Sequence, residues 1–383
     1  MDATRLTDPG FWNDPTPCSW GDPEFVAWCD GQEALRGHVL FQTSGSSGAP
    51  KWIALAKDAL LLSAAAVNSH LGVGESDVWG LVLPPHHVGG FGVVARAFEA
   101  ACGLAVFRRK WQADAFAAWV ESEGVTHTSL VPTQVYDLAV RGVPCPAGVR
   151  AVVVGGGRLE EELGQRARAL GWPVLASYGM TETGSQIATQ SLEILNFPYQ
   201  SSPLPLLPVW RAKIDEEDRL WVAGPALFSG QVTGGPGAWC YEPREGEWHR
   251  SGDRAALAPG GLTILGRADS LLKILGELVD PETVERELAA VAGGLPTGSY
   301  AVAAVPDDRA GHVLVPVFAE SLGGERADAA VAAYNEQAPG FKRLLPPVVL
   351  ADLPRSALGK IRRAELADLA LRAISGLSPS DER

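Results

Sequence analysis

Short hydrophobic runs alternate with amphipathic stretches between residues 37 and 200. The short runs are typical of buried strands, and the longer stretches carry apolar residues at helical spacing. The pattern predicts strands at 37–42, 52–56, 78–83, 104–107, 128–131, 151–154 and 174–177. It predicts helices at 59–71, 92–101, 113–123, 133–141 and 160–170. This alternation indicates a largely parallel sheet with helices on both faces, and the loops after its strands are the expected ligand site.

The pattern changes near residue 201. A turn-rich connector there leads to short strands at 211–214, 220–222 and 262–265, which indicate a small β-subdomain. A second unit follows, with helices at 281–291 and 326–337 and strands at 300–305 and 313–318. We therefore expect an α/β protein with a large N-terminal domain, residues 1–268, and a small α+β C-terminal domain, residues 269–383. Residues 1–36 are expected to form an irregular lead-in with one short helix.

The composition fits an ordinary globular protein, with 46% hydrophobic and 20% charged residues in 383. The formal charge of −13 argues against nucleic acid or an anionic membrane as a partner. Five scattered cysteines suggest neither a disulfide framework nor a zinc site. The acidic N-terminus is unlike a signal peptide, and the sequence has no run of 18 apolar residues. We expect a soluble cytoplasmic protein.

The sequence Thr43-Ser44-Gly45-Ser46-Ser47-Gly48-Ala49-Pro50-Lys51 joins two predicted strands. Its glycines allow backbone angles that other residues avoid, and its hydroxyl and N–H groups can converge on phosphate oxygens. Lys51 would add a positive charge for an anion. The spacing of a Walker loop is absent. The alternative interpretation is a flexible Ser/Gly linker.

This loop resembles the phosphate loop of the adenylate-forming superfamily, which contains acyl-CoA synthetases, peptide-synthetase adenylation domains and luciferases. Two further motifs follow in the family's order, Gly155-Gly156-Gly157 and Tyr178-Gly-Met-Thr181-Glu182. The resemblance implies that Tyr178 and the three glycines border adenine, that Thr181 contacts the α-phosphate, and that Glu182 holds Mg²⁺. A carboxylate suits this hard cation, which neutralises charge as pyrophosphate leaves.

Two later segments resemble the family's nucleotide and hinge motifs. Ser251-Gly252-Asp253 is similar to T-G-D, and Asp253 would then bind the ribose hydroxyls, although such a sequence alone is simply a turn. The segment 265–285 resembles G-R-x-D-x-x-K-x-x-G followed by P-x-x-x-E. By this resemblance Arg267 reaches the ribose, Asp269 is the hinge of a mobile small domain, and Gly276 approaches CoA. The alternative is a turn leading into a helix with solvated charges.

The segment 353–363, L-P-R-S-A-L-G-K-I-R-R, resembles the last motif of the family. Lys360 would bridge the carboxylate of the acid and the α-phosphate during adenylation. Its ammonium would offset charge where two anions approach, and losing such a group costs about 3–4 kcal/mol by analogy with oxyanion donors. An exposed lysine near a C-terminus is otherwise a solubilising charge.

The segment Leu83-Pro-Pro-His86-His87-Val-Gly-Gly matches the family pattern P-x-x-H-x-x-G at His87. A histidine pair can bind metal, but further ligands are missing from the sequence pattern. His87 is expected to gate the acid pocket or to orient the carboxylate. The resemblance also places Ser177 and Gly179 at the acid.

The run Ser185-Gln186-Ile-Ala-Thr189 is similar to the corresponding segment of o-succinylbenzoate–CoA ligases of menaquinone synthesis. Ser185 and Gln186 would hydrogen-bond a second carboxylate or a keto group of the acid, and a site built for a polar group rejects analogues that lack it. The alternative is that both residues only border the next element. The resemblance covers residues 41–363 and says little about residues 1–36, because family members usually carry a longer region before the phosphate loop.

The resemblance implies a two-step ligase that uses ATP, Mg²⁺ and coenzyme A. ATP and the acid would give an acyl-adenylate, and the CoA thiol would then displace AMP. Other aryl- or fatty acyl-CoA ligases, and an adenylating enzyme with a carrier protein as acceptor, stay open. A non-catalytic nucleotide-binding regulatory protein is the alternative from another class, and the joint presence of Lys51, Glu182, Asp253, Arg267 and Lys360 speaks against it. A homodimer is possible.

Overall fold

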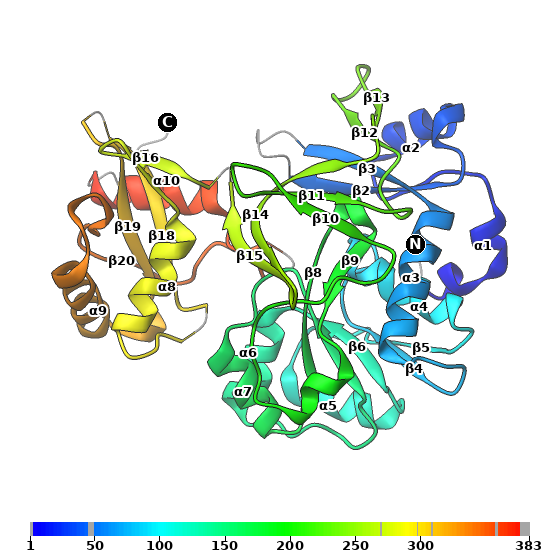
Figure 1. Ribbon diagram of the computed structural model, residues 1–383, viewed down its shortest axis with the longest axis horizontal. Coiled ribbons are helices and arrows are strands. Elements are labelled where there is room, and N and C mark those ends of the chain that lie inside the picture. Colours follow the sequence, from blue (N-terminus) through cyan, green and yellow to red (C-terminus); the bar gives the residue numbers. More distant parts are fainter. Residues whose placement is uncertain are drawn as a thin grey trace. The chain divides into compact units, whose positions relative to one another are not determined.

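The computed structural model describes residues 3–44, 50–268, 270–296, 298–307, 309–356 and 359–375. These residues form two compact units (Figure 1). The first unit holds the chain up to Ser251 together with 255–264, and the second holds 252–254 and the chain from Leu265 onward. Residues 252–254 thus belong by their contacts to the second unit, although the strand that contains them begins in the first.

A six-stranded sheet forms the centre of the first unit. Its strands, in spatial order, are β5 (Gly103–Val106), β4 (Val78–Leu81), β6 (His127–Leu130), β7 (Ala151–Val154), β8 (Val174–Met180) and β9 (Ser185–Thr189). Strands β5 to β8 run parallel, and β9 pairs antiparallel with β8. The expected α/β architecture with a parallel sheet is confirmed.

Helices cover both faces of this sheet (Figure 1). They are α3 (Lys57–Leu71), α4 (Val88–Glu99), α5 (Ala113–Ser122), α6 (Pro132–Arg141) and α7 (Glu161–Ala169). Helix α4 connects β4 to β5 in one direction across the sheet, whereas α5, α6 and α7 connect strands in the opposite direction. Right-handed crossovers therefore put α4 on one face and the other three on the opposite face.

Two further sheets lie wholly or mostly in the first unit. One contains β1 (Cys18–Ser19), β2 (His38–Ser44), β3 (Pro50–Ala56), β12 (Gly230–Thr233) and β13 (Cys240–Pro243). The other contains β10 (Arg211–Ile214), β11 (Arg219–Ala223), β14 (His249–Ala258) and β15 (Gly261–Arg267). Short 3₁₀ turns lie at Thr181–Thr183 (η3) and Leu192–Asn196 (η4). Strands β2 and β3 form an antiparallel hairpin, so Thr43 pairs with Lys51.

The lead-in contains two α-helices where the sequence predicted one. Helix α1 (Pro9–Asn13) and helix α2 (Pro23–Asp30) each begin after an aspartate that accepts a hydrogen bond from the first turn. Single 3₁₀ turns lie at Ala3–Thr7 (η1) and Glu33–Leu35 (η2). Lys57 fastens the lead-in to α3, because its buried ammonium donates to the carbonyl oxygens of Phe11 (2.8 Å) and Asp14 (2.6 Å).

The second unit packs helices on both faces of the three-stranded sheet β18 (Tyr300–Asp307), β19 (Gly311–Ala319) and β20 (Val348–Leu350). One face, including Val302, packs against α8 (Pro281–Val291) and α9 (Gly324–Gln337). The alternate residues of β18, including Ala303, pack against α10 (Arg363–Ile374). A hairpin of β16 (Leu272–Ile274) and β17 (Glu277–Val279), and 3₁₀ turns at Glu320–Leu322 (η5) and Gly340–Lys342 (η6), complete it. Across the described ranges, no helix is long and apolar enough to cross a bilayer.

Candidate nucleotide and acid site

Lys51 and Glu182 form an ion pair in the first unit. Lys51 Nζ donates to Glu182 Oε1 at 3.3 Å, and the two side chains are 31% and 16% exposed. Lys51 lies on β3, directly after the serine- and glycine-rich segment, and Glu182 lies on η3 after β8. A partly shielded carboxylate next to an ammonium fits a phosphate group that carries Mg²⁺. The carboxylate would face the cation, and the ammonium would face a phosphate oxygen.

The three glycines follow β7 and lie beside Ser177. Ser177 Oγ donates to the carbonyl oxygen of Val154 at 3.0 Å, and a Cβ at Gly155 would come within 3.0 Å of the same hydroxyl. Gly156 has φ +78°, a conformation that favours glycine. The sequence therefore needs small residues here to bring the ends of β7 and β8 together.

Gly179 allows the turn between β8 and β9. The register of the two strands shifts between Tyr178 and Gly179, and a Cβ at Gly179 would lie 1.6 Å from the carbonyl oxygen of Ser185. Only glycine permits this approach of the two backbones. Buried Thr183 fixes the same turn, since its hydroxyl lies 3.0 Å from the carbonyl oxygens of Met180 and Ser185. Thr181 and Tyr178 are half-buried beside it.

Arg96 of α4 is a first residue that the sequence interpretation missed. The residue is 1% exposed, and its guanidinium donates to Ser129 Oγ (3.3 Å) and Ser185 Oγ (3.2 Å) and lies 5.1 Å from the ring centre of Trp79. Among the residues that the structure describes, Arg96 Nε is buried without a hydrogen-bond partner. Burial lowers the pKa of Arg96 to about 9, so the group stays charged at neutral pH. A buried cation with a spare donor fits an anionic ligand.

The two polar residues that were assigned to the acid differ in their surroundings. Ser185 is half-buried and has φ +123°, an uncommon conformation for a residue with a side chain, and its hydroxyl faces Arg96. Gln186 is 5% exposed, and its Oε1 accepts a hydrogen bond from Thr189 within β9. The contacts therefore favour Ser185 over Gln186 as the residue that meets the acid, and the assignment of Gln186 stays a prediction.

His87 immediately precedes α4, and its carbonyl oxygen accepts the N–H of Phe91 at 2.9 Å. Its ring centre lies 4.5 Å from that of His86. Burial lowers the pKa of His86. Within the described part of the chain, no three His, Cys, Asp or Glu side chains gather in a way that could hold a metal ion.

His249, at the start of β14, is a second residue that the sequence interpretation missed. It is half-buried, and its ring packs edge-on against Phe228 at 5.1 Å. Burial lowers the pKa of His249. The negative charge of Glu182 opposes this lowering, and the positive charge of Lys51 adds to it. His249 therefore lies close enough to the Lys51–Glu182 pair to take part in its electrostatics.

The second unit brings Asp253, Arg267 and Lys360 into one electrostatic environment. Arg267 Nη1 lies 3.6 Å from Asp253 Oδ1, and a Cβ at Gly252 would lie 2.7 Å from Arg267 Nη2. The pKa of Lys360 is lowered, because nearby protein atoms take the ammonium partly out of water although the residue as a whole is exposed. Asp253 opposes this lowering and Arg267 adds to it.

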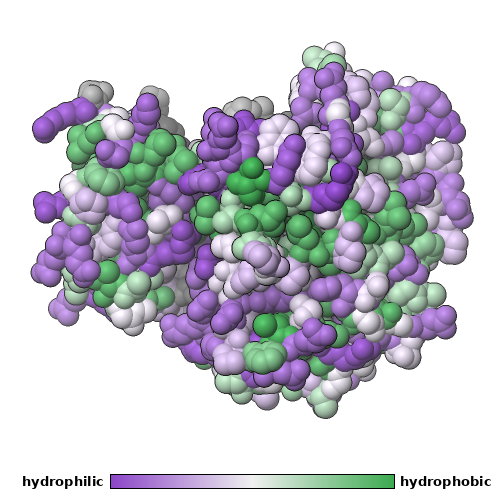
Figure 2. Space-filling view, in the orientation of Figure 1, coloured by the Kyte–Doolittle hydropathy of each residue, from purple (hydrophilic) through white to green (hydrophobic). Residues whose placement is uncertain are grey.

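Gly276 lies at the tip of the β16–β17 hairpin, with φ +91°. The hairpin is apolar at its surface, since Leu275 is 57% and Leu278 is 60% exposed. Figure 2 shows hydrophobic surface on this unit where Figure 1 places β16. Several predicted site residues, Gly45, Ser46, Ser47, Gly48 and Asp269, lie outside the described residues, as does the side chain of Ser44. Thr43 is half-buried, and its hydroxyl donates to the carbonyl oxygen of Lys51 at 3.5 Å.

The sequence matches the family of AMP-binding enzymes over residues 38–231. The chain belongs to this family, which confirms the predicted superfamily. It is 34% identical to the 2-succinylbenzoate–CoA ligase of Escherichia coli (strain K12) over 276 residues, which is 72% of this chain and 57% of that enzyme. The chain thus spans little more than half of that relative.

Two solved structures of the o-succinylbenzoate CoA synthetase MenE from Bacillus subtilis share the fold. The complex with the acyl-adenylate intermediate OSB-AMP is 26% identical with a TM-score of 0.70, over 86% of this chain and 68% of that one. The complex with ATP and magnesium ion is 25% identical with a TM-score of 0.68, over 86% and 69% of the two chains. In those proteins the fold accommodates the nucleotide, the metal ion and the adenylated acid.

Proposed function

We propose that this protein is an ATP-dependent acid–CoA ligase that converts o-succinylbenzoate into its CoA thioester for menaquinone synthesis. Membership of the AMP-binding family supports the reaction type. The observation that supports o-succinylbenzoate as the acid is the buried guanidinium of Arg96 beside Ser185. An acid with two carboxylates offers one to ATP and leaves the other as the anion that this cation fits.

In the first step a carboxylate oxygen of the acid attacks the α-phosphorus of ATP, and the bond from this phosphorus to pyrophosphate breaks. Bound Mg²⁺ would neutralise negative charge on the phosphates, and Glu182 would hold it. Thr43 to Gly48 and Lys51 would bind the phosphates, Thr181 the α-phosphate, and Tyr178 with Gly155 to Gly157 the adenine. Asp253 and Arg267 would bind the ribose, and Lys360 would offset the charge of the approaching anions.

In the second step the CoA sulfur attacks the acyl carbon, the bond from this carbon to the AMP oxygen breaks, and the thiol proton is released. Gly276, on the hairpin with exposed Leu275 and Leu278, would face the thiol arm of CoA. His87, Ser177, Gly179 and Ser185 would border the acid. Ser185 would contribute to selectivity, because a hydrogen-bonding site loses affinity for acids that leave its polar groups unpaired.

A pyrophosphate-release assay with ATP, Mg²⁺ and CoA tests this proposal. The acid panel contains o-succinylbenzoate, benzoate and a medium-chain fatty acid, and mass spectrometry identifies the thioester. We expect a response to o-succinylbenzoate and little to the acids with one carboxylate. A response to another acid would replace the substrate and keep the mechanism, whereas ATP binding without pyrophosphate release from any acid would contradict the catalytic proposal.

A further inference from the structure

Lys360 lies in a short hairpin between β20 and α10. Ser356 N donates to the carbonyl oxygen of Lys360 at 2.8 Å, and Arg362 N donates to that of Pro354 at 2.9 Å. The side chain of Lys360 therefore projects from a backbone closed by its own hydrogen bonds. The place of the ammonium therefore depends on how the described arms of the hairpin, 354–356 and 359–362, are held.

Arg355 connects the two described arms of this hairpin to each other and to a neighbouring segment. Its Nη1 donates to the carbonyl oxygen of Gly359 at 2.6 Å, and its Nη2 donates to that of Gly298 at 2.6 Å. One guanidinium thus connects the residue before Lys360 to the segment that precedes β18. This contact holds the near end of the hairpin.

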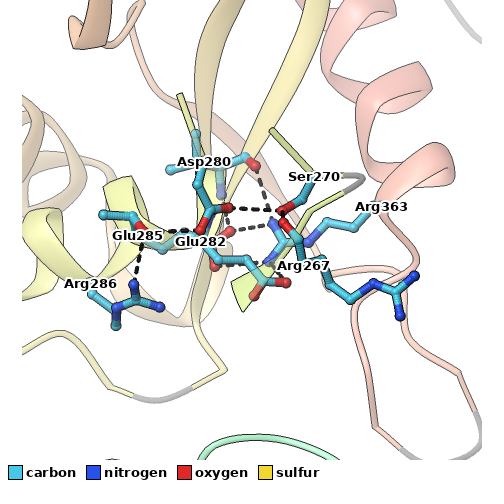
Figure 3. Close-up of polar contacts among 9 residues, drawn as sticks. Arg267, Ser270, Asp280, Glu282, Glu285, Arg286 and Arg363 are labelled. Atoms are coloured by element: carbon cyan, nitrogen blue, oxygen red, sulfur yellow. Dashed lines mark hydrogen bonds and ion pairs between the residues drawn. The ribbon is translucent and has the colours of Figure 1, made fainter. Parts of the chain in front are cut away.

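Arg363 fastens the far end, where the hairpin enters α10. Its Nη1 and Nη2 contact the two carboxylate oxygens of Glu285 on α8, the Nη2–Oε2 distance being 2.9 Å (Figure 3). Nη1 also donates to the carbonyl oxygen of Val302 on β18 at 3.2 Å, and Glu285 Oε1 accepts the N–H of Val302 at 2.7 Å. Glu285 is 16% exposed and Arg363 is 39% exposed, so the carboxylate is the better shielded partner of this two-pronged pair. Three elements meet at one carboxylate.

Glu282 connects this network to Lys360. Its Oε1 lies 3.5 Å from Arg363 Nη2, and its negative charge is close enough to Lys360 to oppose the lowering of that lysine's pKa by burial. The first turn of α8 is itself fixed, because Asp280 accepts hydrogen bonds from Glu282 N (3.1 Å), Thr283 Oγ1 (2.9 Å) and Ser270 Oγ (3.1 Å). Figure 3 shows these acceptors gathered at the start of α8. Glu282 and Glu285, which contact Arg363, therefore lie on a helix whose first turn is fixed by hydrogen bonds.

We propose that Arg363 is a positioning residue for Lys360. The two contacts of its guanidinium with Glu285 fix the end of the hairpin, where it joins α10, to α8 and β18. The Lys360 ammonium is thereby held at one place. The inference rests on the proposed function, in which Lys360 acts in adenylation. A displaced ammonium would slow that step, because electrostatic stabilisation requires the charge to be in place beforehand.

The test compares Arg363→Lys with Arg362→Lys. Lysine at 363 keeps the charge and loses the planar fork. Arg362 is the matched control, since it is the adjacent residue and forms an exposed ion pair with Glu365 at 3.2 Å. We expect Arg363→Lys to lower kcat of adenylation roughly tenfold, as small misplacements of catalytic groups do. KM for ATP, and thioester formation from preformed adenylate, should stay within about twofold because the binding groups are untouched. Arg362→Lys should change neither half-reaction.

A double substitution distinguishes positioning from general damage. If Arg363 acts through Lys360, adding Arg363→Lys to Lys360→Ala should cause no further loss of adenylation. A further loss in the double variant, or an equal loss of both half-reactions in Arg363→Lys alone, would overturn the inference.

Amide hydrogen exchange of residues 354–362 gives a measurement that needs no activity. Arg363→Lys should speed exchange in this hairpin, while Arg362→Lys should leave it unchanged. Equal exchange in wild type and Arg363→Lys would overturn the inference. Failure of the wild-type protein to release pyrophosphate would contradict the proposed function instead, and the exchange measurement would still decide the question of the hairpin.

Discussion

Arg96 Nη2 lies 3.2 Å from Ser185 Oγ, so a hydrogen bond joins the buried side of α4 to the first residue of β9. The space for this contact depends on Gly92, where a Cβ would come within 3.1 Å of Arg96 Nη2 and 3.4 Å of Ser185 Oγ. The uncommon φ of Ser185, +123°, turns its backbone next to the same guanidinium. The cation and the hydroxyl are thus arranged before any ligand binds.

Arg96→Met should abolish the preference for an acid with a second carboxylate. Removing one partner of a buried charge pair costs about 2–5 kcal/mol, so kcat/KM for o-succinylbenzoate should fall roughly 30-fold or more. The kcat/KM for acids with one carboxylate should change little, since these acids offer the guanidinium no second carboxylate in the wild type either. Initial rates of pyrophosphate release with o-succinylbenzoate and benzoate measure the ratio. An equal loss with both acids would show that Arg96 supports the fold rather than the selectivity.

Glu182→Gln should weaken the dependence of adenylation on Mg²⁺. The amide keeps the size of the side chain and removes the charge that suits a hard cation. The metal contributes several kcal/mol to such steps, so we expect a fall of roughly 100-fold and a higher Mg²⁺ concentration at half-maximal rate. A magnesium titration of pyrophosphate release measures both, with Glu193→Gln at an exposed position as the control. An unchanged titration curve would assign the metal to other residues.

His127 should make the stability of the first unit depend on pH. The ring is fully buried, 3.7 Å from Asp77 Oδ1, and burial lowers its pKa from 6.5 to about 4. The unfolded chain therefore binds the extra proton first, so stability is lost as pH falls from about 6.5 towards 4. Between pH 7.5 and pH 5 the wild type should lose about 2 kcal/mol more than His127→Gln. Urea unfolding at both pH values measures this difference, and parallel losses would refute it.

Much of the fold follows from the sequence because the parallel strands are short apolar runs flanked by amphipathic helices. Residues 151–154 form β7 as expected, and the predicted helix at 113–123 ends one residue earlier. Strand β14 was missed because His249–Ala258 mixes charged and apolar residues on an exposed sheet. Helix α10 was also missed, since its buried positions, Leu366 and Ala370, are few. Tertiary packing decides such segments.

The candidate site was predictable where it is built from local motifs. Lys51 and Glu182 belong to two of these motifs, lie far apart in the sequence and form an ion pair in the structure, and their roles at the nucleotide stay predictions. Arg96 was not predicted, because an arginine between alanines in an apolar helix has no local motif. The signal that could have found it is the charge itself within the apolar run 88–98, since a buried charge needs a partner. The contact of Arg363 with Glu285 was likewise not predictable, because it forms only when α8 and α10 pack on one sheet.

Lys360→Ala should block adenylation and spare thioester formation from preformed adenylate. A positioned cation contributes about 3–4 kcal/mol where charge develops, and only the first step brings two anions together. Because the pKa of Lys360 lies below its usual 10.5, the ammonium loses its proton at a lower pH than a free lysine does. The rate of adenylation should therefore fall as pH rises through this pKa, and Lys360→Arg should move the fall to higher pH because arginine stays charged. Single-turnover assays of both half-reactions across pH measure this. An equal loss of both half-reactions in Lys360→Ala would contradict this prediction. So would an unchanged fall of the rate at high pH in Lys360→Arg, because the required charge would then belong to another group.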